Sequence, residues 1–135
     1  MDCCCCGGVT WDTTGHVASL DHSSQLIFGG FSSSSSIFSL QHLQSLNLAN
    51  NTFYFSQIPS GFHELGNLTY LINYFNYRIG IPTLKLENPN LRMLIQNLKD
   101  LRELHLNGLD ILAQRKEWCQ ALSSSVPDLQ VLSMS

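Results

Sequence analysis

The sequence predicts an α/β-type solenoid, in which similar coils stack and each coil contributes one short strand to a parallel sheet. Three observations support this prediction. The pattern LxxLxxLxL begins at Leu40 and begins again at Leu65, Leu98 and Val126. In the first two units an Asn follows five residues after the third leucine, and an Ile-Pro pair comes later. Recurrence at such periods is typical of stacked repeat proteins.

The leucine spacing has a direct physical interpretation. Leu46 and Leu48 lie two residues apart, so both point to one face of a strand. One coil cannot bury its own apolar face, and neighbouring coils must therefore stack. Asn51 and Asn76 are expected to turn inward and bond backbone groups of the bend, while Leu109 takes that position in the third unit. An amphipathic helix has leucines at similar spacings, but four recurrences favour a short leucine-rich-repeat horseshoe with parallel strands on its concave face.

Composition and charge exclude several classes of protein. Apolar residues make up 44% of the 135 residues and charged residues 13%, which is enough apolar content for a folded core. The net charge is −3 and every Lys or Arg lies at Arg78 or later, so a nucleic-acid partner has no electrostatic support. No apolar run approaches the ~20 residues of a membrane-spanning helix. Met1 is followed at once by Asp2 and four cysteines, a start that does not have the pattern of a signal peptide.

Two segments carry a family resemblance. The first is CCCCGGVTWDTTGHVASLDHSS at the start of the chain, and the second is IPSGF from Ile58 to Phe62. Through these segments, the chain resembles plant leucine-rich-repeat receptor-like proteins of the Verticillium-wilt-resistance type. The resemblance is to an N-terminal fragment that contains the cap and the first repeats. The resemblance implies a full-length protein with a signal peptide, an extracellular horseshoe, one membrane-spanning helix and a short tail without a kinase. Such a protein lies on the extracellular side of the plasma membrane, and the location of this chain itself is left open.

The domain organisation follows from the resemblance and the repeat intervals. Residues 1–36 are expected to form the cap, and residues 37–135 about three to four repeats. The segment 71–97 is expected to be a degenerate repeat, because the interval from Leu65 to Leu98 is too long for one unit and too short for two. Asn73 falls where an inward leucine is expected, which suggests that parts of two repeats are fused. His22 likewise stands where the cap strand would carry an inward leucine.

The five cysteines are an odd number, so one thiol stays unpaired or bonds between molecules in a secreted protein. These cysteines are Cys3, Cys4, Cys5, Cys6 and Cys119. The resemblance implies that one or two of the first four brace the cap by a disulfide. It also implies that the partner of Cys119 would lie in a following repeat, so Cys119 is predicted to be a free thiol here.

No catalytic, metal or cofactor site is predicted. The five histidines have no regular spacing, and the chain contains no GxSxG, P-loop or HExxH motif. A zinc site formed by Cys3-x-x-Cys6 with His16 or His22 is the alternative. Structural zinc usually takes two spaced ligand pairs, and a second pair is missing from the sequence, so terminal thiols without a metal are favoured.

The residues between the leucines of each strand are expected to face outward and to form a ligand-binding surface. These candidates are Ser45, Asn47, Tyr70, Ile72, Tyr74, Glu103, His105, Asn107, Gln130 and Ser133. Two N-glycosylation sequons begin at Asn50 and Asn67.

The function expected from these features is recognition rather than catalysis. The resemblance implies a protein or peptide ligand and receptor-kinase partners, in defence signalling at the plant cell surface. Two alternatives stay open: a truncated fragment that is non-functional or acts as a decoy, and an intracellular leucine-rich-repeat scaffold.

Overall fold

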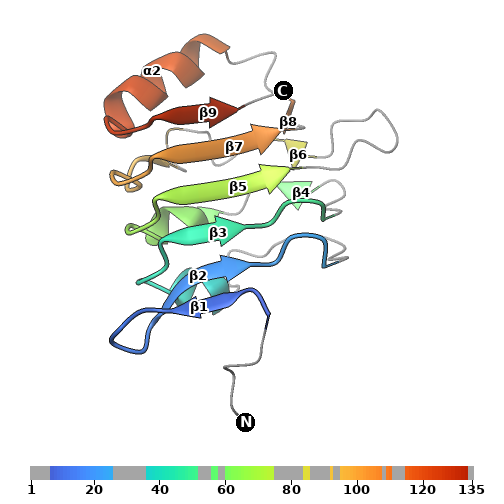
Figure 1. Ribbon diagram of the computed structural model, residues 1–135. Coiled ribbons are helices and arrows are strands. Elements are labelled where there is room, and N and C mark those ends of the chain that lie inside the picture. Colours follow the sequence, from blue (N-terminus) through green and yellow to red (C-terminus); the bar gives the residue numbers. More distant parts are fainter. Residues whose placement is uncertain are drawn as a thin grey trace.

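A computed structural model describes residues 7–25, 36–51, 56–57, 60–74, 84–85, 92, 95–107, 109–110 and 115–133. The main feature is a six-stranded sheet whose strands lie side by side and are stacked from β1 near the bottom of the view to β9 near the top (Figure 1). Its strands, in order across the sheet, are β1 (Val9–Trp11), β2 (Val17–Asp21), β3 (Ser45–Asn47), β5 (Tyr70–Tyr74), β7 (Glu103–Asn107) and β9 (Val131–Ser133). Only the first pair, β1 with β2, is antiparallel, and every later pair is parallel.

In the described part of the chain, a second parallel ladder has one strand after each of β3, β5 and β7. It consists of the short strands β4 (Ser56–Gln57), β6 (Leu84–Lys85) and β8 (Leu109–Asp110). Among the described residues, helical segments include η2 (Ser36–Ser39), η3 (Ser60–Glu64) and α2 (Arg115–Ser125). The structure therefore confirms the predicted stack of parallel strands, whereas the curvature of a horseshoe stays a prediction.

A row of inward leucines fixes the register of the large sheet. Leu20, Leu46, Leu71 and Leu104 stand opposite one another on successive strands, and each is at least nine-tenths buried. Burying one leucine contributes about 1.5–3 kcal/mol. A slip of one residue would turn this whole row to solvent, so the leucines hold each coil in place on the next.

The helical segments close the other side of this core. On α2 the buried side chains are Trp118, Ala121 and Leu122, at the spacing that puts them on one helical face. In the earlier coils the rings of Phe38 on η2 and Phe62 on η3 meet edge to face, with centroids 5.1 Å apart. The apolar core thus runs continuously through the stacked coils.

Asn51 is the one buried polar residue among those described. Its Nδ2 donates to the carbonyl oxygen of Leu48 in its own coil (3.1 Å) and to that of His22 in the preceding coil (2.8 Å). The inward amide predicted from the sequence is confirmed here, and it joins two coils as well as stabilising one bend. Asn76 lies outside the described residues.

The long interval between the second and third units still forms one coil. β5 pairs without interruption to β3 on one side and β7 on the other. Asn73 stands opposite Leu106, which is an inward position, as predicted. Residues 70–74 are therefore a regular strand, although the predicted degenerate segment begins at residue 71. Most of the rest of that segment lies outside the described residues.

In the described part of the chain, no helix has the length and apolar character needed to span a membrane.

Replacing Asn51 with Ala is expected to lower the free energy of unfolding by about 2–3 kcal/mol, because the carbonyl oxygens of Leu48 and His22 lose a donor at a buried and a part-buried site. Urea denaturation followed by circular dichroism measures the change. Asn97→Ala, at an exposed position, is the matched control and should stay within about 0.5 kcal/mol of the parent. Equal stability of the two variants would contradict the structural role of Asn51.

Candidate ligand-binding face

The outward side chains of the large sheet form two columns that cross its strands. The first outer column is set by the register that pairs Ser45 with Tyr70, and the second by the register that pairs Asn47 with Ile72. In the first column lie Ser19, Ser45, Tyr70, Glu103 and Val131. In the second lie Asp21, Asn47, Ile72, His105 and Ser133.

Seven of the ten residues predicted for this face lie in the two columns. They are Ser45, Asn47, Tyr70, Ile72, Glu103, His105 and Ser133. Tyr74 and Asn107 stand opposite each other at the ends of β5 and β7, but their side chains lie outside the described residues.

The placement of Gln130 on this face is wrong. Val131 is the residue opposite Glu103, and Gln130 precedes β9, where its N–H donates to the carbonyl oxygen of Arg102. The physical reason is the inward row, because Leu132 must stand opposite Leu104 and this fixes the outward positions at residues 131 and 133. Val131 adds an apolar side chain to the face, with 39% of its surface exposed.

Several polar side chains of the face make contacts with other residues of the chain. The Oδ1 of Asn47 accepts the N–H of Ala49 (3.0 Å), and its Nδ2 lies 3.4 Å from the Oδ2 of Asp21. The Nε2 of His105 lies 3.4 Å from a carboxylate oxygen of Glu103. Tyr70, with 38% of its surface exposed, is the large aromatic side chain that these described contacts leave open to a partner.

A second row of residues, which the sequence analysis missed, lies where the strands begin. We call it the edge row, and it consists of the residues three positions before the first outer column, namely His16, His42, Asn67, Asp100 and Asp128. A depression of about 450 Å³ lies along this edge. It is lined by Asp12, His42, Gln44, Asn67, Thr69, Asp100, Arg102 and Asp128. The constant spacing of the edge-row residues from the repeat leucines is the sequence signal that could have identified this row.

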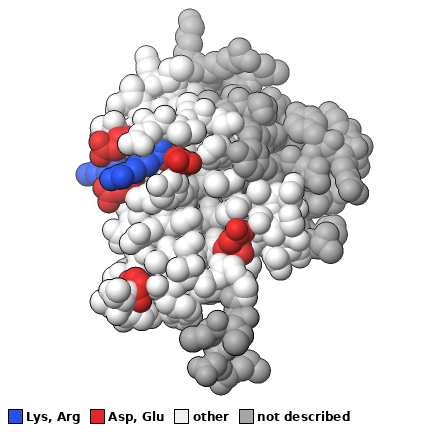
Figure 2. Space-filling view, viewed as in Figure 1, with Lys and Arg blue, Asp and Glu red and all other residues white. Residues whose placement is uncertain are grey.

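Charged side chains gather at one end of the edge row. Figure 2 shows acidic and basic side chains together at the left, where β7 and β9 begin in Figure 1. Asp100 and Arg102, which precede β7, and Asp128, which precedes β9, line the depression, and Asp12 lines it from the turn between β1 and β2. Three carboxylates against one guanidinium make the depression acidic, which favours cationic groups.

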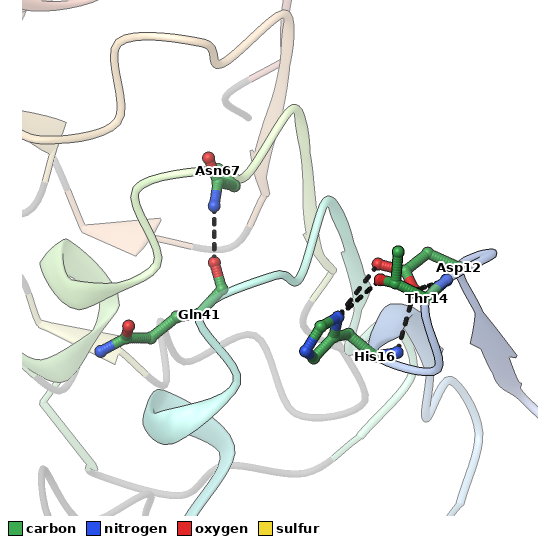
Figure 3. A network of polar contacts seen from close by, with 5 residues as sticks. All are labelled: Asp12, Thr14, His16, Gln41 and Asn67. Atoms are coloured by element: carbon green, nitrogen blue, oxygen red, sulfur yellow. Dashed lines mark hydrogen bonds and ion pairs between the residues drawn. The ribbon is translucent and has the colours of Figure 1, made fainter.

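The turn between β1 and β2 is organised by the carboxylate of Asp12 (Figure 3). Its Oδ1 accepts the N–H of His16 (2.9 Å), the hydroxyl of Thr14 (2.7 Å) and the N–H of Thr14 (2.8 Å). These hydrogen bonds stabilise the ionised form, the bond from the His16 backbone most of all, and they lower the pKa of Asp12 to about 2. Asp12 therefore carries a full negative charge at neutral pH.

Curated proteins similar to this chain are receptor-like proteins of plants. The chain is 37% identical to "Receptor-like protein 6" of Arabidopsis thaliana and 35% identical to "Receptor-like protein Cf-9 homolog" of Solanum lycopersicum, each over 82% of this chain. It is 48% identical to "Receptor-like protein 7" of Arabidopsis thaliana over 50% of the chain. No protein-family model matches the chain.

The chain is homologous to plant receptor-like proteins. This confirms the resemblance drawn from the sequence, although the finer assignment to the Verticillium-wilt-resistance type stays a prediction. The chain spans 14%, 15% and 7% of the lengths of receptor-like protein 6, the Cf-9 homologue and receptor-like protein 7. Its similarity to receptor-like proteins is thus to a small part of each.

The structure shows the surroundings of the two predicted glycosylation sites and of the predicted free thiol. Asn50 is exposed in a left-handed turn (φ 58°), and Asn67 is exposed at the edge of the depression, where its Nδ2 donates to the carbonyl oxygen of Gln41 (Figure 3). Cys119 lies exposed on α2 as a free thiol. The cysteines at positions 3–6 lie outside the described residues.

The Asp12 carboxyl is expected to titrate near pH 2, and Thr14→Val should raise its pKa toward the ordinary value of 3.8 because one hydrogen bond to the carboxylate is lost. Since the folded pKa lies below the unfolded one, the stabilisation is complete above pH ~4 and is lost as the pH falls through about 2. Carboxyl ¹³C NMR measures the pKa. An unchanged pKa in Thr14→Val would show that the hydroxyl does not hold the carboxylate.

Proposed function

We propose that the chain is part of the ligand-recognition region of a plant cell-surface receptor-like protein that acts in defence signalling. The outer face of the large sheet binds a protein or peptide ligand, and receptor kinases are the partners that pass on the signal. The names of the homologues support the receptor role. The observation that carries the binding role is the regular outward display of side chains across five parallel-stacked strands.

The chemistry of the face supports a protein or peptide ligand. Neighbouring strands of a sheet lie about 4.8 Å apart, so the two outer columns present a dense, flat array of side chains. Tyr70 and Ile72 provide an aromatic and an aliphatic contact on one strand, and Glu103 with His105 provides a polar pair on the next. An exposed aromatic beside polar groups is the usual composition of a binding hot spot.

Residues of this face should matter for the response of the whole receptor, whereas exposed residues away from the face should not. The doubly substituted receptor Tyr70→Ser/Glu103→Lys is expected to need at least ~10-fold more of a fungal extract than the parent to trigger an oxidative burst in leaf cells, because it loses an aromatic anchor and reverses a charge. The matched control is Gln96→Ser, at an exposed position outside the sheet.

A response to the extract that is present in the parent and unaltered in the double variant would contradict ligand binding on this face. Both receptors must be present at the cell surface in equal amounts, which surface labelling measures.

The extracellular location gives a separate prediction. When the gene that contains this chain is expressed in leaf cells, the product should carry an N-glycan at Asn67 or Asn50, since both side chains are exposed. Treatment with a peptide N-glycosidase should then shift its mass, and the double variant Asn50→Gln/Asn67→Gln should abolish the shift. A product without glycan and with reduced cysteines would support the intracellular scaffold instead.

A further inference from the structure

Two histidines and one aspartate meet where the cap hairpin contacts the next coil. The register of β2 with β3 pairs Ser19 with Ser45. His16 and His42 each lie three positions before one of these serines, so the register places them side by side in the edge row. Their rings stack with centroids 3.8 Å apart and planes 18° apart. One ligand atom from each histidine and one from Asp12 all lie within 4.8 Å of one another.

The carboxylate of Asp12 is held in place by one oxygen and leaves the other available. The Oδ1 accepts the three hydrogen bonds of the turn. The Oδ2 lies 3.6 Å from the Nδ1 of His16 and accepts no hydrogen bond from the described residues. An ionised oxygen that is oriented by its neighbour oxygen needs little rearrangement to bind a cation.

The hydroxyl of Thr14 fixes which nitrogen of His16 can act as a ligand. This hydroxyl has one proton, which it donates to the Oδ1 of Asp12 (2.7 Å), so toward the Nδ1 of His16 (2.7 Å) it can only accept. The Nδ1 of His16 therefore carries the proton, and the Nε2 carries the free lone pair. Metal-binding histidines are oriented in the same way, by a hydrogen bond from the nitrogen that does not bind the metal.

His42 supplies the second imidazole. Its side chain is exposed, and within the described residues its ring contacts His16 without a hydrogen bond to either ring nitrogen. Rings that stack face to face point their lone pairs along parallel planes, so one exposed ring must turn for both nitrogens to reach the same ion. The nitrogen of His16 that lies near the Oδ2 of Asp12 is the protonated Nδ1 (3.6 Å), so the His16 ring and this carboxylate must also shift to bring the Nε2 toward the Oδ2. Around a tetrahedral ion with bonds of about 2.0–2.1 Å, the ligand atoms lie about 3.4 Å apart.

We propose that Asp12, His16 and His42 form a binding site for a divalent zinc ion. Two imidazole nitrogens with one carboxylate oxygen suit zinc, whereas magnesium and calcium prefer oxygen ligands alone. Three protein ligands leave the fourth tetrahedral position open. Asp12 and His42 also line the depression of the edge row, so this position adjoins a solvent-accessible acidic cavity. A bound ion would join the cap hairpin to the first coil of the stack.

The test is a titration of the full 135-residue chain with zinc chloride near neutral pH, in which isothermal calorimetry measures the binding. The five cysteines are first replaced by serine, because thiolates bind zinc strongly on their own. Protein made in bacteria avoids a glycan at Asn67, which borders the same depression. One zinc ion is expected to bind per chain, and magnesium chloride at the same concentration should give no binding.

Single substitutions assign the ligands. His16→Gln and His42→Gln should each weaken zinc binding by at least ~100-fold, since removal of a ligand costs no less than the largest effects of outer-shell changes. Thr14→Val should weaken it by about 10-fold, because the Asp12 carboxylate and the His16 ring lose their common orienting group. His63→Gln, which removes an imidazole from η3, is the matched control and should bind zinc like the parent.

A second measurement keeps the test decisive when a variant is unstable. Histidine ring NMR of the folded parent should show zinc shifting the resonances of two of the five histidines, assigned through the two Gln variants. If the chain with five Cys→Ser substitutions does not melt cooperatively, the parent chain is used instead. The parent is first allowed to fold, and its thiols are then blocked with iodoacetamide before the zinc titration. Absence of zinc binding to the folded chain, or binding unchanged in both His16→Gln and His42→Gln, would overturn the proposal.

Discussion

The row of inward leucines, and the backbone ladder that it brings into register, is the constraint on which the rest of the structure depends. Leu20, Leu46, Leu71 and Leu104 stack through the centre of the molecule. Beside them, a backbone N–H at the start of each strand donates to a carbonyl oxygen of the preceding coil. An example is the N–H of Gln44, which donates to the carbonyl oxygen of Ala18 (2.7 Å). Burial selects the leucine positions and the hydrogen bonds fix the spacing, so every other side chain is placed relative to these two.

This constraint explains why repeat units of unequal length share one sheet. The offsets between paired strands are set by whichever residues reach the inward row, and the extra residues are accommodated between the strands. Tyr70 thus pairs with Glu103 across the longest interval as regularly as Ser45 pairs with Tyr70. Outward side chains on such a sheet can change residue by residue without altering the scaffold.

The two surfaces of the chain follow from the same register but differ in chemistry. The outer columns combine apolar and polar side chains on a flat face, which fits a protein or peptide ligand. The edge row gathers histidine and carboxylate groups beside a depression, which fits a cation. Asn51 joins coils inside the molecule, and the proposed ion would join the hairpin and the first coil at the surface.

The sequence by itself determined the repeat, the inward leucines, the inward Asn51 and most of the outer face, because each of these follows from local alternation and spacing. It also placed Gln130 wrongly, although the repeat pattern that begins at Val126 aligns Leu132 with Leu46 and so predicts Val131 at the outward position that the structure shows. Only the tertiary structure brought His16 beside His42 and Asp12. The two histidines belong to different coils, and their contact arises from the pairing of those coils through backbone bonds that no short sequence pattern encodes.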